Sequence, residues 1–227
     1  RDAVLRAVVL RYEGGAADLV LVAHRSVLDA VALRLIADAV VHGSGPEGPR
    51  VVPGVPGTPS PGDAADAPPG VVRTVLAGPT ERVLPVLAVA AGLVRARYTG
   101  EQHAVVRVRA GDADRPPRAL GAFEGEASIP VDASGGASTT EVLADAAAVE
   151  PGGCADDPGD PAVTILGTAV PTRAGERYLP CQVAPSPFTL VPRPGGDGSL
   201  ALELHYRRRE VDRATAARFV RHLAAAY

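Results

Sequence analysis

Residues 43–70 constrain the fold of this chain more than any other stretch. Fifteen of these 28 residues are Gly or Pro. Proline lacks a backbone N–H and glycine loses the most backbone entropy on folding, so the stretch can form neither a helix nor a central strand. We therefore predict a flexible linker or long surface loop here. A second stretch rich in structure breakers, "EPGGCADDPGDP", occupies residues 150–161.

Composition narrows the classes of protein to consider. Hydrophobic residues make up 46% of the chain and aromatic residues only 4%, so Val, Leu and Ala must build the core. All 23 basic residues are Arg and the net charge is −3, with both signs interspersed, so neither nucleic acid nor an anionic membrane is an expected partner. No run of 18 apolar residues and no leader-like segment occurs, which predicts a cytoplasmic protein.

The cysteines and histidines of the chain do not have the sequence spacing of metal ligands. Cys154 and Cys181 stand 27 positions apart, which predicts reduced thiols and no metal centre. His103, His205 and His222 are scattered along the chain. We expect neither a metal nor a bound cofactor.

The N-terminal segments predict a β-hairpin followed by a helix. "AVLRAVVLRYE" and "ADLVLVAHR" flank Gly14 and Gly15, a hairpin signature. Strict alternation in the second segment places Leu19, Leu21, Ala23 and Arg25 on one face, and Val20, Val22 and His24 on the other. Ser26 then opens a helix over residues 27–41, with Asp29 in the position of a capping-box acid. Apart from Arg34 and Asp38, this helix is apolar all round, so we expect it to be largely buried.

The rest of the chain alternates between segments whose apolar residues have the spacing of a strand and segments whose apolar residues have the spacing of a helix. Strands or extended segments are predicted at 71–77, 103–111, 118–133, 162–171, 177–184, 186–192 and 200–208. Helices are predicted at 80–97, with Pro85 delaying or kinking its start, at 138–149, with Ser138 and Glu141 as a capping pair, and at 212–227. Because several strands lack an intervening helix, we expect an α/β fold with a mixed β-sheet and flanking helices.

Four stretches in this order resemble a known family. They are "HRSVLDA" at 24–30, "LVRARYTGEQHAVVRV" at 93–108, "LGAFEGEASIPVD" at 120–132 and the terminal strands and helix at 186–227. They resemble landmarks of nonribosomal peptide synthetase condensation domains, the first being similar to the HHxxxDG motif. The resemblance implies a chloramphenicol-acetyltransferase-like fold of two lobes around a channel. In such domains, acyl groups carried on the phosphopantetheine of carrier proteins are joined as amides during natural-product (antibiotic) biosynthesis.

The resemblance also implies a domain division and a set of partners. Residues 1–42 would be a remnant of the N-terminal lobe with the motif strand and helix, 43–70 a linker, and 71–227 the C-terminal condensation lobe. The partners would be a peptidyl carrier protein or neighbouring synthetase domains. A partial two-lobed fold should expose apolar surface and unpaired strand edges. We therefore also expect another polypeptide to cover these surfaces, such as a second chain that completes the fold.

The motif itself departs from the family at its second histidine. In the resemblance His24 takes the first His position, Arg25 the second, and Asp29 the motif Asp. The second His positions or deprotonates the attacking amine in the family, whereas a guanidinium has five donors, no acceptor and a pKa above about 12. Arg25 therefore cannot be a general base. His24 is expected to be a packed structural histidine, and Asp29 to hold the turn through an Arg contact or to cap the helix.

Further departures are Ala30 for the motif Gly, Arg107 for a Gly, and Gly125–Glu126 for Asn-Thr. Taken as separate losses, they favour a catalytically inactive domain with a structural or recruitment role. The HRxxxD variant of the motif is typical of X domains of glycopeptide synthetases, which recruit haem oxygenases. The second hypothesis is an active condensation enzyme that forms amides or esters through a non-standard site, with Arg25 stabilising an oxyanion.

Overall fold

A computed structural model of the 227-residue chain describes most of the predicted elements. The described residues are 5–24, 27–43, 68–78, 82–111, 115, 119–148, 162–167, 175–177, 179, 184–194 and 199–227. The chain forms two compact units: unit 1 comprises Arg1–Pro61 and Asp112–Glu124, and unit 2 comprises Gly62–Gly111 and Gly125–Tyr227. The second stretch of unit 1 falls inside the range that the sequence assigned to the C-terminal lobe.

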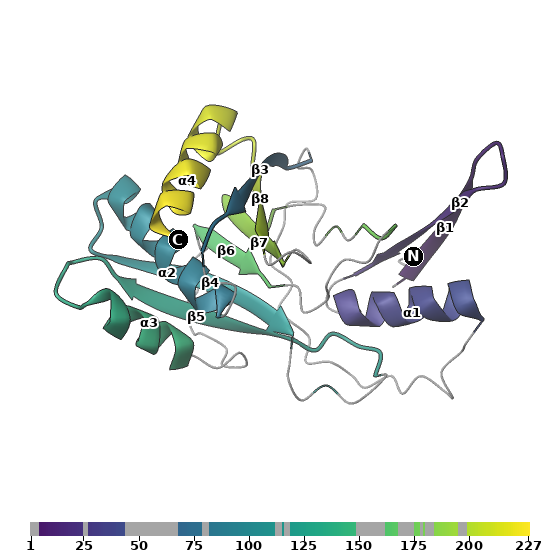
Figure 1. The fold of residues 1–227 in the computed structure, drawn as a ribbon, viewed down its shortest axis with the longest axis horizontal. Coiled ribbons are helices and arrows are strands. Elements are labelled where there is room, and N and C mark those ends of the chain that lie inside the picture. The colour runs from purple at the N-terminus through teal and green to yellow at the C-terminus, as the bar shows by residue number, and fades with distance from the viewer. Residues whose placement is uncertain are drawn as a thin grey trace. The chain divides into compact units, whose positions relative to one another are not determined.

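Unit 1 contains the predicted hairpin. Strands β1 (Leu5–Arg11) and β2 (Ala17–Ala23) pair antiparallel with Val8 opposite Val20 (Figure 1). Gly14 and Gly15 in the turn have φ values of 96° and 88°, which glycine adopts without a steric penalty. The predicted alternation is confirmed over the described part of β2: Leu19, Leu21 and Ala23 are half-buried, whereas Val20, Val22 and His24 are exposed.

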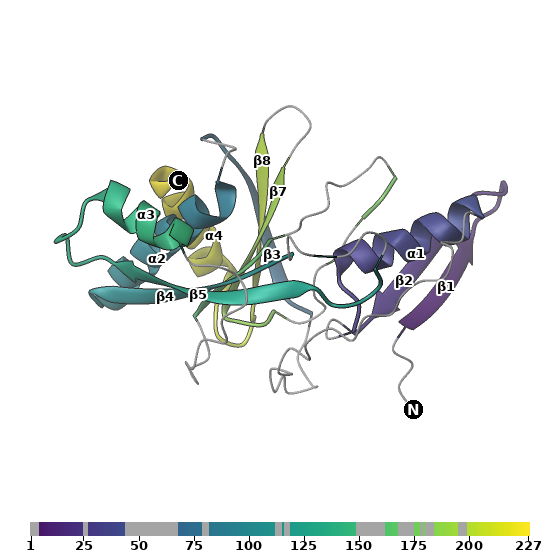
Figure 2. The ribbon, with the colours of Figure 1, turned by 90° about the horizontal axis from the view of Figure 1, so that it is seen from below.

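The helix that follows differs from the prediction in its start and in its burial. Helix α1 (Ala30–His42) lies beside β2 (Figure 2) and begins at Ala30, because Asp29 is the N-cap and not the third helical residue. Only Ala30 and Ala32 are buried, and the last turn is open, with Val40 60% and Val41 64% exposed. The expectation of a largely buried helix is wrong, since a two-stranded sheet is too small to cover a helix with apolar residues on most of its surface.

Unit 2 is a mixed sheet with helices on one face. Its strands are β3 (Gly70–Leu76), β4 (His103–Gly111), β5 (Glu124–Asp132, with Glu124 counted in unit 1), β6 (Val163–Leu166), β7 (Phe188–Pro194) and β8 (Leu200–Tyr206). Its helices are α2 (Val83–Thr99), α3 (Thr139–Ala148) and α4 (Arg213–Ala226). The strand order is β3-β8-β7-β6-β4-β5, with β6 parallel to β4 and β7, and β8 antiparallel to β3 and β7 (Figure 1). The predicted mixed sheet is confirmed.

The core of unit 2 lies between the sheet and its helices. Leu87 on α2 and Phe219 on α4 are at most 1% exposed and pack with sheet residues such as Leu204. Gly92 lets α2 approach the sheet closely, since a Cβ there would lie 2.6 Å from Val131 Cγ2. Alternate residues of the strands point away from this core, among them Arg73 on β3 and Glu203 and His205 on β8.

Local helix signals are mostly as predicted. Helix α2 starts at Val83, later than expected, with Pro85 in its first turn, where proline costs no hydrogen bond. Ser138 and Glu141 form the predicted capping pair, with the Ser138 N–H donating to the Glu141 carboxylate at 2.8 Å. None of the helices formed by the described residues is long and apolar enough to cross a bilayer. The two cysteines, loop 150–161, most of 43–70 and most of segment 177–184 lie outside the described residues.

Candidate functional site

The motif turn joins β2 to α1 within unit 1. The His24 carbonyl accepts hydrogen bonds from the N–H groups of Val27 and Leu28, at 3.0 and 3.1 Å. The His24 side chain is exposed, so the expectation of a packed histidine is wrong: β2 turns this face away from α1. Arg25 and Ser26 lie outside the described residues, and the role of Arg25 remains a prediction from sequence.

Asp29 is the organising side chain of this turn. It is 4% exposed, and its Oδ1 accepts from the N–H of Ala32 at 2.9 Å, which caps α1. Its Oδ2 accepts from the N–H of Phe123 at 2.9 Å and forms an ion pair with Nη2 of Arg115. Both contacts expected of the motif Asp, the helix cap and the Arg contact, are therefore present.

Arg115 binds the turn from a distant part of the sequence. Its guanidinium also donates to the carbonyls of Ala119 and Gly121, at 3.3 Å each, and lies 4.6 Å from the ring centroid of Phe123. The Asp29 N–H donates back to the Gly121 carbonyl at 3.2 Å. Because both oxygens of Asp29 are occupied by these donors, Asp29 is a structural acid that locks the turn. Sequence reasoning missed Arg115, which carries no motif signal.

Two of the residues at which the sequence departs from the condensation-domain pattern contact each other in unit 2. Arg107 Nε lies 2.8 Å from Glu126 Oε1, and Glu126 Oε2 pairs with Arg109. Glu126 thus links the side chains of two arginines on β4 to β5. Arg107 and Glu126, which the sequence presents as separate departures, thus form one charge-paired arrangement.

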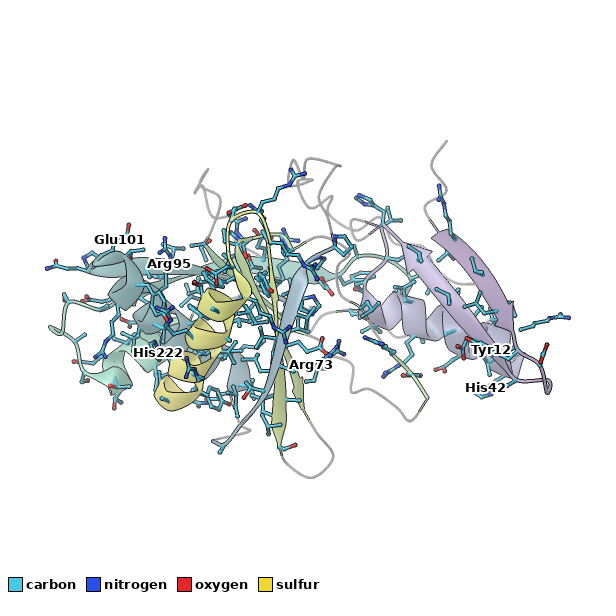
Figure 3. The ribbon with its side chains drawn as sticks, turned by 90° about the horizontal axis from the view of Figure 1, so that it is seen from above. Tyr12, His42, Arg73, Arg95, Glu101 and His222 are labelled. Carbon is cyan, nitrogen blue, oxygen red and sulfur yellow. The ribbon has the colours of Figure 1, made fainter. Side chains whose placement is uncertain are left out.

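A further polar cluster, which sequence reasoning also missed, lies on β8 and its neighbours. Glu203 accepts from Nε of Arg73 at 2.9 Å and from Arg193 at 3.4 Å, and it lies 3.1 Å from Nε2 of His205. Arg73, on β3, is labelled in Figure 3. Burial alone would raise the pKa of Glu203, but the hydrogen bonds from Arg73 and His205 and the charges of Arg193 and Arg73 outweigh it and lower the pKa to about 2. Glu203 is therefore an ionised acceptor at neutral pH.

Among the described residues, no group of three or more His, Cys, Asp and Glu side chains could hold a metal ion. His24 and Asp29 belong to unit 1, whereas Glu203 and His205 belong to unit 2.

Comparison with known proteins gives a fold but no sequence family. No protein-family model and no curated protein sequence matches the chain. Solved structures do match: a condensation domain that mediates chain release from the enacyloxin polyketide synthase has a TM-score of 0.63 at 19% identity, over 98% of this chain and 59% of the other. The starter condensation domain of rhizomide synthetase RzmA has a TM-score of 0.67 at 15% identity, over 98% and 69%.

The epimerization domain from the third module of tyrocidine synthetase B also matches, with a TM-score of 0.58 at 12% identity, over 98% of this chain and 71% of the other. The chain thus spans less than two thirds of the length of the enacyloxin domain and about 70% of the other two. This chain has the fold of the condensation domains of nonribosomal peptide and polyketide synthetases.

Proposed function

We propose that this chain is a condensation-like domain of a carrier-protein-dependent synthetase and that it serves as a structural or recruitment module without joining thioesters itself. The observation that carries the proposal is the state of the motif acid: both carboxylate oxygens of Asp29 accept hydrogen bonds from the protein. The sequence places Arg25 where the family has its proton-accepting histidine. Neither Arg25 nor Asp29 therefore offers a free atom that can take a proton from an attacking amine.

His24 does not replace the missing base. It follows Val20 and Val22 on the exposed face of the hairpin, opposite to the face on which Arg25 would continue the alternation. An oxyanion-stabilising Arg25 without a proton acceptor would provide only part of the catalysis. The fold alone does not decide the reaction, because an epimerization domain shares it with condensation domains.

Exposed apolar side chains on unit 1 support a polypeptide partner. Those of the hairpin are Val8, Val9, Leu10, Tyr12, Val20 and Val22, each between 39% and 56% exposed. Val40 and Val41 add to them at the end of α1. Surfaces of this kind mark protein–protein contacts. The proposed occupant is a carrier protein or a neighbouring domain of the same synthetase; recruitment of a haem oxygenase is the X-domain-like version of the role.

A binding measurement tests the recruitment role. Phosphopantetheinylated carrier protein from the same assembly line is titrated into the labelled chain, with Val8→Arg and Val20→Arg variants, which lie on one face of the hairpin, and the exposed control Arg97→Glu on α2. We expect binding that both hairpin variants weaken at least tenfold and that the α2 variant leaves unchanged. Absence of binding to carrier proteins and neighbouring domains alike would contradict the proposal.

The alternative function, an amide- or ester-forming enzyme with a non-standard site, requires a proton acceptor outside the motif. Nδ1 of His205 has no hydrogen-bond partner among the described residues, while Nε2 of the same ring lies 3.1 Å from Glu203. This unpartnered nitrogen is the reason to keep the alternative, and an assay of product formation separates the enzymatic function from the recruitment role.

A further inference from the structure

The sheet of unit 2 has one protected edge and one open edge. The strand order places β5 at one edge and β3 at the other. On β5 the exposed Pro130 has no N–H to offer to a further strand, and proline on an edge strand prevents unwanted pairing. No proline occurs in β3 over Gly70–Leu76, so this edge lacks that protection.

β3 is a regular strand with free backbone groups on its outer side. All seven of its residues, from Gly70 to Leu76, pair with β8 in an uninterrupted antiparallel register. In such a ladder every second residue directs its N–H and C=O groups away from the neighbouring strand. No described segment pairs with β3 on that outer side. A row of free donors and acceptors of this kind is a template to which a further strand can add.

The side chains of β3 are exposed on the face of the sheet that lies away from the helices. Val72 and Leu76 pack with the core, so Val71, Arg73 and Val75 point to the opposite face. The two valines on that face are 36% and 64% exposed, and the Arg73 side chain is 62% exposed. An added strand would place two apolar side chains next to the valines, with one side chain between them next to Arg73.

Arg73 favours a negative charge on the added strand. Its Nε donates to Glu203 at 2.9 Å, and no described residue binds its two terminal nitrogens. Glu203 also accepts from Arg193 at 3.4 Å, so its single negative charge compensates that of Arg73 only in part. A carboxylate opposite Arg73 would bind the terminal nitrogens through charge-assisted hydrogen bonds.

A second copy of this chain fits the open edge less well than an acidic segment does. Two copies of β3 that pair antiparallel over their full length would place Arg73 of one copy directly opposite Arg73 of the other, because Arg73 is the middle residue of the strand. Like charges directly opposite each other on neighbouring strands are destabilising. The charge of this edge therefore favours a partner segment with an acid in that position.

We propose that β3 is a docking edge for an extended acidic segment of a partner protein, which adds to the six-stranded sheet as a further strand. The segment presents an apolar residue, an acid and an apolar residue on the face of Val71, Arg73 and Val75. Backbone hydrogen bonds supply the affinity, and the alternate side chains supply the selectivity. The site goes beyond the proposed recruitment surface, because that surface belongs to unit 1 whereas β3 belongs to unit 2.

Three peptides test the docking edge in the full chain. They have the sequence Thr-Val-Thr-X-Thr-Val-Thr with Glu, Gln or Arg at X, which places both Val side chains and X on one face of a strand. In a chemical-shift titration the Glu peptide should bind about two- to fivefold more tightly than the Gln peptide, the value of a partly exposed ion pair, and the Arg peptide should bind most weakly. Hydrogen exchange with saturating Glu peptide should show protection of alternate β3 amides, those that point to the free edge.

Matched variants separate the edge from the rest of the surface. Arg73→Gln should abolish the difference between the Glu and Gln peptides, whereas the exposed control Arg97→Gln on α2 should preserve it. Val75→Asp should weaken binding of the Glu peptide, whereas Val40→Asp, at a similarly exposed valine of unit 1, should not. Amide hydrogen exchange of β8 in each variant shows that the sheet is intact.

Equal binding of the three peptides, or binding that leaves the β3 amides unprotected, would overturn the proposal. Protection of the edge that rises with the concentration of the chain alone would also overturn it, since a second copy would then occupy β3. Carrier-protein binding at the hairpin does not enter these measurements, so the docking edge and the proposed function can fail separately.

Discussion

Arg107 and Glu126 form an ion pair, with 2.8 Å between Nε and Oε1, at two positions where the sequence departs from the condensation-domain pattern. Glu126 also pairs with Arg109, so one carboxylate is shared by two guanidinium groups. The arginine side chains are 18% and 20% exposed, and that of Glu126 is 39% exposed. The two departures thus meet in one ion pair between β4 and β5, and we expect them to be energetically coupled.

A double-mutant cycle tests this coupling. We expect Glu126→Ala to cost more stability than Arg107→Ala, because it leaves two arginines without their shared carboxylate. The coupling energy between Arg107 and Glu126 should be about 0.5–1 kcal/mol, as for partly exposed pairs. Urea denaturation of the four proteins measures it. Strictly additive effects would show that the contact contributes nothing.

Asp29 should be the most sensitive polar position of unit 1. Asp29→Ala removes the helix cap and leaves Arg115 without its carboxylate, so we expect a loss of about 3–5 kcal/mol in the stability of this unit. Asp29→Asn keeps a capping oxygen and should cost less. Hydrogen exchange of the Ala32 and Phe123 amides, which both donate to Asp29, measures the effect. The exposed control Asp145→Asn should leave both exchange rates unchanged.

Glu203 should make stability depend on acid pH. Its pKa falls from 4.5 to about 2 on folding, so its contribution is complete above pH 4.5 and is lost as the pH falls through 2. We therefore expect Glu203→Gln to be less stable than the parent protein at pH 6, with a difference that shrinks between pH 4.5 and 2. Chemical denaturation at a series of pH values checks this. A difference that stays constant with pH would contradict it.

Gly92 should tolerate no side chain while Val131 faces it. The Cβ of an alanine would lie 2.6 Å from Val131 Cγ2, closer than any normal contact. We expect Gly92→Ala to destabilise unit 2 by about 1–3 kcal/mol, the usual cost of overpacking. Thermal unfolding of the double variant with Val131→Ala should show partial recovery. Equal stability of Gly92→Ala and the parent would mean that α2 can move away from β5.

The sequence predicted the elements well because their signals are local. The hairpin follows from Gly14 and Gly15, the α3 cap from Ser138 and Glu141, and the alternation of β2 from its own side chains. The burial of α1 was overestimated, because apolar composition says what a helix could bury and not what is present to cover it.

The site contacts depended on pairings that sequence periodicity does not encode. Arg115 is 86 residues from Asp29, and nothing in its neighbours marks it as a partner. The sequence alone does not distinguish His205 from the other scattered histidines, whereas the β7–β8 register places it beside Thr189. Asp29, in contrast, is identified from its position in the motif, because a cap is a local signal whereas an ion pair across the fold is not.

The central claim, that this condensation fold lacks a proton acceptor at its motif, is tested most directly by product formation. Donor and acceptor carrier proteins of the same assembly line, loaded with acetyl and glycyl thioesters, are incubated with the full-length protein, and intact-protein mass spectrometry follows the acceptor. An active condensation domain is the positive control. We predict no acetylglycyl product above the background of the carrier proteins alone, with the parent protein and with His205→Phe. Product that forms with the parent and disappears in Arg25→Ala or His205→Phe would contradict the account.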